Sequence, residues 1–214
     1  MLGGLLGLDG VSFLQSMIAR PIVAGPLAGV LVGDPVAGMW AGALLELVSL
    51  KQLPVGANRH WDTGPAAVAA AVAAVTIRPA GLALLVAVGF GTMVGVAGSW
   101  SIHLLRHLNA RFVASQVGEP LAPPALARRH LAAMALDFGR AVTLTLAGVF
   151  AVLLVSPWLG DAPQSALTGS AVVLFLAASV ALGVVVGTMA RGRSVLAAFC
   201  TGILFSAVVT LWLR

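Results

Sequence analysis

The sequence predicts an all-α integral membrane protein with roughly six to seven transmembrane helices. Of its 214 residues, 60% are hydrophobic and only 9% are charged, whereas a soluble domain has about 25% charged residues. The apolar stretches are continuous rather than alternating, which favours membrane-spanning helices over a β-barrel. The same composition excludes a soluble, disordered or nucleic-acid-binding chain, because each of these needs far more charge. At about 20 residues per crossing, the apolar content corresponds to roughly six or seven helices.

The region 9–78 is predicted to consist of short segments that are broken or re-entrant. The breaks fall at Arg20-Pro21, Gly25-Pro26, Gly33-Asp34-Pro35 and Pro54, and at the polar block 58–62. Proline removes a backbone donor and glycine permits sharp turns, so these positions interrupt helices. Broken backbone at membrane depth must be buried in protein or line a wet cavity, which makes it the best sequence pointer to a transporter's binding site. Ordinary loops at the membrane surface remain the alternative.

The region 79–214 is predicted to contain ordinary transmembrane helices, one at 79–105 and three more within 130–214. The connection 106–129 has four arginines and a single acidic residue, Glu119. Cytoplasmic loops carry an excess of Lys and Arg, which predicts a cytoplasmic loop here and accounts for the net charge of +5 without a nucleic-acid partner. The whole chain, 1–214, is therefore expected to form one polytopic domain in the inner (cytoplasmic) membrane.

Glu46 is the leading candidate for a functional residue. It is the only charge in the apolar run 39–50. A carboxylate at bilayer depth costs about 2.5 kcal/mol or more on insertion scales, so such a residue is a functional candidate by default. The alternative is that Glu46 lies near a helix end and reaches water beside Lys51.

A second candidate group, Asn58, Trp61 and Asp62, lies just before an alanine-rich run. Asp62 or Thr63 would be a natural N-cap for the helix that follows, and capping alone would explain the aspartate. The same residue types also suit a sugar, because carboxylates and amides can bond neighbouring hydroxyls. The Trp61 ring would cover the C–H face of a pyranose. Residue types alone leave both interpretations open.

Three further polar features have simpler explanations. Gln15 could hydrogen-bond a ligand, although such an amide more often joins two helices. His103 and His107 have the i, i+4 spacing of metal ligands, but without an accompanying glutamate they are interpreted as an interfacial pair, and no metal site is predicted. Asp137 and Arg140 are expected to form a mutual i, i+3 ion pair. The sequence has no phosphate loop and no nucleophile elbow, so we predict no catalytic residue and no cofactor.

The segment QSMIARPIVAGPLAGVLVGD at 15–34 resembles the membrane IIC subunit of sugar phosphotransferase systems (PTS) of the mannose, fructose and sorbose family. Its continuation, GMWAGALLEL at 38–47, does so too. The family pattern has Arg-Pro, then Gly-Asp, then a helix ending in Leu-Glu, then a Gly-Ala turn leading to Asp. Here the last part reads LPVGA at 53–57, followed by Asp62. The specific resemblance covers roughly 9–75, and the remainder is similar in hydropathy and length.

The resemblance implies a subunit of an elevator-type sugar permease that is not itself an enzyme. Its partners would be a membrane IID subunit and the cytoplasmic IIB and IIA proteins, with IIC–IID pairs assembled into a trimer in the lipid bilayer. The IIB phosphohistidine would phosphorylate the translocated sugar. By this analogy Glu46 and Asp62 contact sugar hydroxyls, Asn58 and Gln15 are further candidates, and Trp61 stacks on the sugar. The alternatives are an independent small transporter or channel for another polar solute, and a membrane-embedded transferase.

Overall fold

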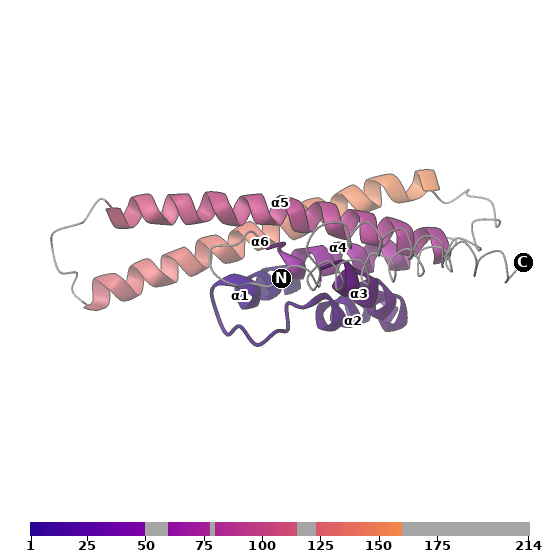
Figure 1. Ribbon diagram of the computed structural model, residues 1–214, viewed down its shortest axis with the longest axis horizontal. Coiled ribbons are helices and arrows are strands. Elements are labelled where there is room, and N and C mark those ends of the chain that lie inside the picture. The colour runs from indigo at the N-terminus through magenta and orange to yellow at the C-terminus, as the bar shows by residue number, and fades with distance from the viewer. Residues whose placement is uncertain (50–59, 78–79, 115–122, 160–214) are drawn as a thin grey trace, which may run out of the picture.

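The computed structural model describes residues 1–49, 60–77, 80–114 and 123–159, and every regular element in these ranges is an α-helix (Figure 1). The helices are α1 (Leu2–Val11), α2 (Pro21–Val32), α3 (Pro35–Ser49), α4 (Thr63–Thr76), α5 (Ala80–Ala114) and α6 (Pro123–Leu159). The predicted all-helical class is confirmed for this part of the chain. The last two expected spans lie outside the described residues, so the count of six to seven stays a prediction.

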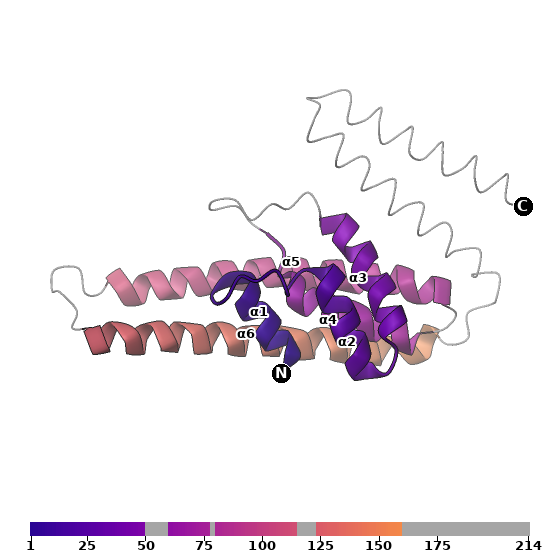
Figure 2. The ribbon, with the colours of Figure 1, turned by 90° about the horizontal axis from the view of Figure 1, so that it is seen from below.

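Two helices, α5 and α6, are long and apolar enough to cross a membrane by length and composition. They contain 35 and 37 residues. At 1.5 Å per residue each is about 50–55 Å long, whereas the hydrocarbon core of a bilayer is about 30 Å thick. The two helices run antiparallel and extend together beyond the shorter helices at one end (Figures 1 and 2).

The predicted connection 106–129 is partly helical. Helix α5 continues through Ala114 and α6 begins at Pro123, so most of this stretch is helical. The segment from Arg106 to Ala114 contains neither proline nor glycine, and nothing in it ends the helix where hydropathy falls. Pro123 and Pro124 stand in the first turn of α6, where a missing N–H costs no helical hydrogen bond.

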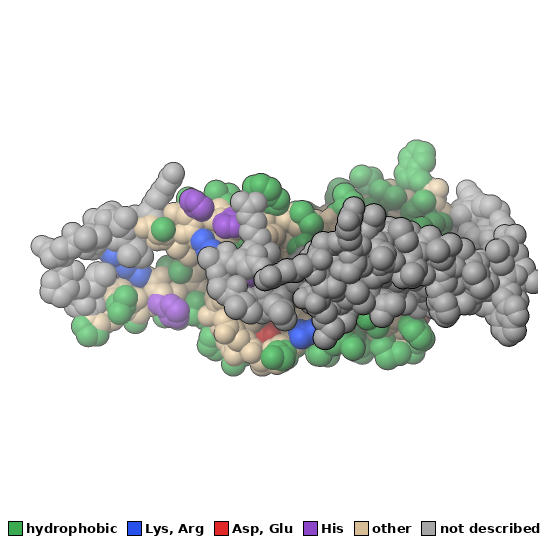
Figure 3. Space-filling model, viewed as in Figure 1, with side chains coloured by type: hydrophobic (Ala, Val, Ile, Leu, Met, Phe, Trp, Pro, Cys, Tyr) green, Lys and Arg blue, Asp and Glu red, His purple; other side chains and the backbone are tan. Residues whose placement is uncertain are grey.

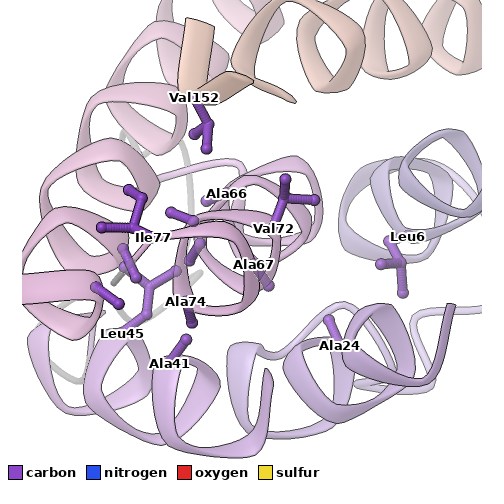
Figure 4. Close-up of a cluster of buried hydrophobic side chains, with 14 residues drawn as sticks. Leu6, Ala24, Ala41, Leu45, Ala66, Ala67, Val72, Ala74, Ile77 and Val152 are labelled. Carbon is purple, nitrogen blue, oxygen red and sulfur yellow. The ribbon is translucent and has the colours of Figure 1, made fainter. Parts of the chain in front are cut away.

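Helix α4 is the centre of the described structure and contacts each of the other five helices. Its alanines pack on all sides, and Ala67, Ala70 and Ala73 are completely buried. Because alanine is small, the neighbouring helices approach α4 closely. Side chains from α3, α5 and α6 complete this core, for example Leu45 and Val152 (Figure 4).

The short helices α2 and α3 form a hairpin around a tight turn. Gly33, just after α2, has φ of +92°, the left-handed conformation that ends many helices and favours glycine. The next residue, Asp34, accepts the backbone N–H of Ala37 through Oδ1 at 2.9 Å. This bond satisfies one of the free donors at the start of α3. The break predicted at 33–35 is therefore a helix–turn–helix junction.

Glycines allow the backbones of α2 and α3 to touch. Each helix has a small-residue pair of the GxxxG type, Gly25 with Gly29 in α2 and Gly38 with Gly42 in α3. A Cβ added to Gly25 would lie 2.5 Å from the carbonyl oxygen of Gly38, and a Cβ added to Gly38 would lie 2.5 Å from that of Gly25. The reciprocal contact leaves no room for a side chain at either position.

Helix α1 packs against α6 through another set of glycines. Gly3 lies against Thr145, and Gly7 lies against Ala141. On the outside of the described helices, large apolar side chains are exposed, as expected for a protein surrounded by lipid (Figure 3). They include Leu31, Met39, Trp100, Phe150 and Trp158.

Candidate functional site

Glu46 joins α3 to the beginning of α2. Its carboxylate is buried, and Oε1 accepts hydrogen bonds from Arg20 Nε, at 2.7 Å, and from Arg20 Nη2. Its Oε2 accepts the backbone N–H of Ile22 at 3.3 Å. Ile22 lies in the first turn of α2, where backbone donors lack helical partners and negative charge is favoured. Glu46 therefore caps a neighbouring helix, a role that the sequence does not reveal.

The Arg20–Glu46 pair lies at the edge of the protein. The Arg20 side chain is 48% exposed, whereas that of Glu46 is only 9% exposed. The guanidinium thus connects a sheltered carboxylate to the surface. Lys51, the neighbour considered in the sequence interpretation, lies outside the described residues.

Asp62 stands at the N-cap position of α4, but its side chain makes no capping hydrogen bond. Instead Oδ2 accepts from Arg140 Nη1 of α6 at 2.7 Å. The backbone N–H of Asp62 donates to the Gly95 carbonyl of α5 at 3.1 Å. A Cβ at Gly98 would collide with the Asp62 side chain, so glycine at this position of α5 makes room for the aspartate. Capping by the side chain does not explain Asp62.

Arg140 lies at the centre of a buried polar cluster, defined by Ser12, Asp62, Ser101, Asp137 and Arg140. Arg140 Nε donates to Asp137 Oδ1 at 2.9 Å, which confirms the predicted i, i+3 pair. Its Nη1 donates to Ser101 Oγ at 2.9 Å as well as to Asp62. Ser12 Oγ donates to the other Asp137 oxygen, Oδ2. The cluster therefore joins the end of α1, the start of α4, and helices α5 and α6.

Asp9 is a further buried carboxylate that sequence reasoning missed. Its Oδ1 accepts from the backbone N–H and the hydroxyl of Ser16 at 2.7 and 2.5 Å, and its Oδ2 accepts the N–H of Ala19 at 2.9 Å. These bonds fix the 12–20 loop, in which Leu14, Gln15 and Met17 have positive φ angles of 52–66°. Such angles are uncommon for residues other than glycine. The sequence signal that could have identified Asp9 is an acidic residue near the end of a short apolar helix.

Leu45, which precedes Glu46, and Asp62 both pack against glycines of α5. Gly91 lies against Leu45 of α3, the residue before Glu46, and Gly98 lies against Asp62. These glycines are seven residues apart on one helix face, a distance of about 10 Å along the axis. Glu46 bonds Arg20 and Asp62 bonds Arg140, so the two carboxylates belong to separate ion pairs.

The remaining candidates have different surroundings. Trp61 is half-buried and packs on Gly95 of α5, next to Asp62. Gln15 is exposed, and its Nε2 lies 3.5 Å from the Val11 carbonyl oxygen. Asn58 lies outside the described residues. The structure thus brings Trp61 and Asp62 together and places Gln15 in the loop before α2.

The metal alternative can be checked for the described residues. None of them form a group of three or more His, Cys, Asp or Glu side chains that could hold a metal ion. His103 and His107 have ring centroids 6.2 Å apart, and His107 Nδ1 lies 2.9 Å from the His103 carbonyl oxygen.

The four motifs of the resemblance fall at four successive helix boundaries. Arg20-Pro21 begins α2, Gly33-Asp34 forms the turn to α3, Glu46 lies in the last turns of α3, and Asp62 precedes α4. The family model EII-Sor, described as the PTS system sorbose-specific IIC component, matches residues 1–212. The chain belongs to this family. No curated protein and no solved structure matches it.

Membership of EII-Sor extends the resemblance from the first third to nearly the whole chain. The protein is a PTS IIC subunit, a membrane-embedded sugar transport component. The two long apolar helices α5 and α6 fit this location. The roles of Glu46, Asp62, Asn58, Gln15 and Trp61 in sugar binding stay predictions.

Proposed function

We propose that this EII-Sor protein binds a sugar between its short helices and carries it across the inner membrane by an elevator-type movement. A cytoplasmic IIB protein of a mannose-family system, supplied with phosphate by IIA, phosphorylates the sugar on arrival. The observation that carries the proposal is the pair of buried carboxylates, Glu46 and Asp62, each held by an arginine at a helix junction. The proposed complex is a trimer of IIC–IID pairs.

Arginine-held carboxylates are suited to binding a neutral, hydroxyl-rich guest. Each of these carboxylates bonds an arginine, and carboxylate oxygens can accept further hydrogen bonds from hydroxyl donors. Glu46 has spare acceptor capacity, because its Oε2 receives only a long bond of 3.3 Å from Ile22 among the described residues. Trp61, beside Asp62, adds an aromatic face for the C–H side of the ring.

Uptake measurements on carboxylate variants test this assignment. In cells that express the complete complex with IID, IIB and IIA, Glu46→Ala and Asp62→Ala should each abolish uptake of radiolabelled mannose, fructose or sorbose. Asp34→Asn is a matched control, since its amide oxygen can still accept the Ala37 N–H, and it should transport normally. Membrane insertion of every variant is verified by quantifying protein in the membrane fraction. Normal uptake by both alanine variants would remove Glu46 and Asp62 from the site.

A further inference from the structure

Apart from Glu46 in α3, the predicted sugar contacts in the described residues lie in two segments, the start of α4 and the loop after α1. The polar cluster around Arg140 connects these two segments. Asp62 follows Trp61 at the start of α4, and Ser12 begins the loop that contains Gln15. Both segments bond the Asp137–Arg140 pair of α6. We propose that Arg140 is a positioning residue of the sugar site. It holds the Asp62 carboxylate in the orientation that lets it accept a hydrogen bond from a sugar hydroxyl. This inference rests on the proposed function and deepens it.

The geometry of the guanidinium explains how one residue can orient another. Asp137 Oδ1 lies 2.9 Å from Nε and 2.8 Å from Nη2, so one edge of the planar group is fixed by a neighbour on its own helix. The remaining nitrogen, Nη1, is then directed at Asp62 and Ser101. Ser101 is fixed in turn, because its hydroxyl donates to the Gly98 carbonyl at 2.7 Å. A lysine could supply the charge but not this rigid arrangement of donors.

Burial makes Asp62 dependent on Arg140. The side chains of Asp62, Asp137 and Arg140 are 2%, 1% and 10% exposed. The cluster has two carboxylates and one guanidinium, so removal of Arg140 would leave both buried acidic groups without their arginine partner. Removing one partner of a buried pair is strongly unfavourable even where the pair itself adds little stability. We expect Asp62 to take up a proton or change its orientation when Arg140 is replaced.

The cluster also places the Gln15 loop relative to Asp62. Ser12 lies directly after α1 and bonds Asp137 Oδ2, while Asp9 fixes the same loop further along through Ser16 and Ala19. A change at Arg140 therefore acts on Asp62 directly and on the loop only through Asp137. Because Arg140→Lys keeps a positive charge in the cluster, we expect it to change sugar affinity more than the amount of folded protein.

Transport kinetics of the complete IIC–IID–IIB–IIA system test the inference. Arg140→Lys, Arg140→Gln and Asp62→Asn are compared, with Arg128→Gln on the exposed part of α6 as the control. Radiolabelled mannose, fructose and sorbose are the probes. Arg140→Lys should raise the apparent KM at least tenfold with wild-type amounts of folded protein and less than a threefold change in maximal rate. Arg140→Gln should raise the apparent KM further than Arg140→Lys.

The outcomes separate this inference from the proposed function. Unchanged KM in both Arg140 variants, while Asp62→Asn loses uptake, would overturn the positioning role and leave the sugar site in place. A fall in folded protein with wild-type KM in the remainder would assign Arg140 to stability and also overturn it. Normal uptake by Asp62→Asn, or no uptake of any probe by the wild-type complex, would overturn both proposals.

Discussion

Replacing Gly25 of α2 with alanine tests how closely the α2–α3 hairpin must pack. The new Cβ would lie 2.5 Å from the Gly38 carbonyl oxygen and 2.7 Å from the Gly42 Cα, both rigid backbone atoms. Real Cβ atoms essentially never come closer than 3.0 Å, and ordinary contacts begin at 3.4 Å. The two helices must therefore separate by about 0.5–0.9 Å, since core packing of this density has no slack to absorb the methyl group.

The size of the effect follows from two opposing contributions. Overpacking of this kind costs typically about 1–3 kcal/mol, whereas Gly→Ala within a helix gains up to about 1 kcal/mol from helix propensity. Gly139→Ala in α6 isolates the second contribution, because nothing lies within 4 Å of the position where its Cβ would stand. Gly25→Ala should therefore melt about 2–12 °C below Gly139→Ala, at about 2–4 °C per kcal/mol for a chain of this size.

Thermal unfolding of the two purified variants in the same detergent measures this difference. Sugar uptake supplies an independent readout, because a shift of about 0.5–0.9 Å would lengthen the 2.7 Å bond between Arg20 Nε and Glu46 Oε1 to about 3.2–3.6 Å, at or beyond the usual limit. Gly25→Ala should lose uptake and Gly139→Ala should keep it. Equal or higher thermal stability of Gly25→Ala would refute the close-packed hairpin.

Three further predictions concern the loop before α2, the α2–α3 turn and the orientation in the membrane. Asp9→Ala removes the acceptor for Ser16 and Ala19, so limited proteolysis of purified protein should cleave the 12–20 loop much faster than in wild type, and equal rates would contradict the anchoring role. Gly33→Ala should lower stability by about 1–2 kcal/mol through its positive φ alone, and Gly33→Asn by less, because asparagine tolerates this conformation; equal melting of all three proteins would exclude strain. A cysteine at Ser115 should react with a membrane-impermeant reagent only in inverted vesicles, and labelling on intact cells would reverse the predicted topology.

The sequence predicts local features of this protein better than contacts between helices. The i, i+3 spacing of Asp137 and Arg140 is enough to predict their ion pair. By contrast, the Arg140–Asp62 and Arg20–Glu46 pairs bridge 78 and 26 residues, and their partners depend on how the helices pack. A general signal was present: charges in apolar segments almost always find partners. It does not say which arginine meets which carboxylate.

The helical parts of the connection 106–129 have a specific physical origin. Hydropathy reports where a segment leaves the lipid, whereas a helix ends only where sequence or packing stops it. Beyond Arg106 the chain becomes polar but contains no helix breaker until Gly118 and Pro120. The long helices α5 and α6 therefore continue past the apolar part of the chain. Contacts of glycines, such as that of Gly98 with Asp62, could not be predicted from the sequence either, because a glycine in an apolar helix does not indicate which residue packs against it.

Packing of the short helices does not require the two arginine–carboxylate pairs. Glycine and alanine contacts already join these short helices closely, and a buried ion pair adds little stability compared with well-packed apolar side chains. A site that binds and releases a sugar needs groups that exchange partners without being left unpaired. In the proposed site, Glu46 beside Arg20 and Asp62 beside Arg140 would meet this need, since sugar hydroxyls could bond free carboxylate lone pairs or replace one arginine bond. We therefore expect each arginine–carboxylate pair to re-form when the sugar leaves the proposed site.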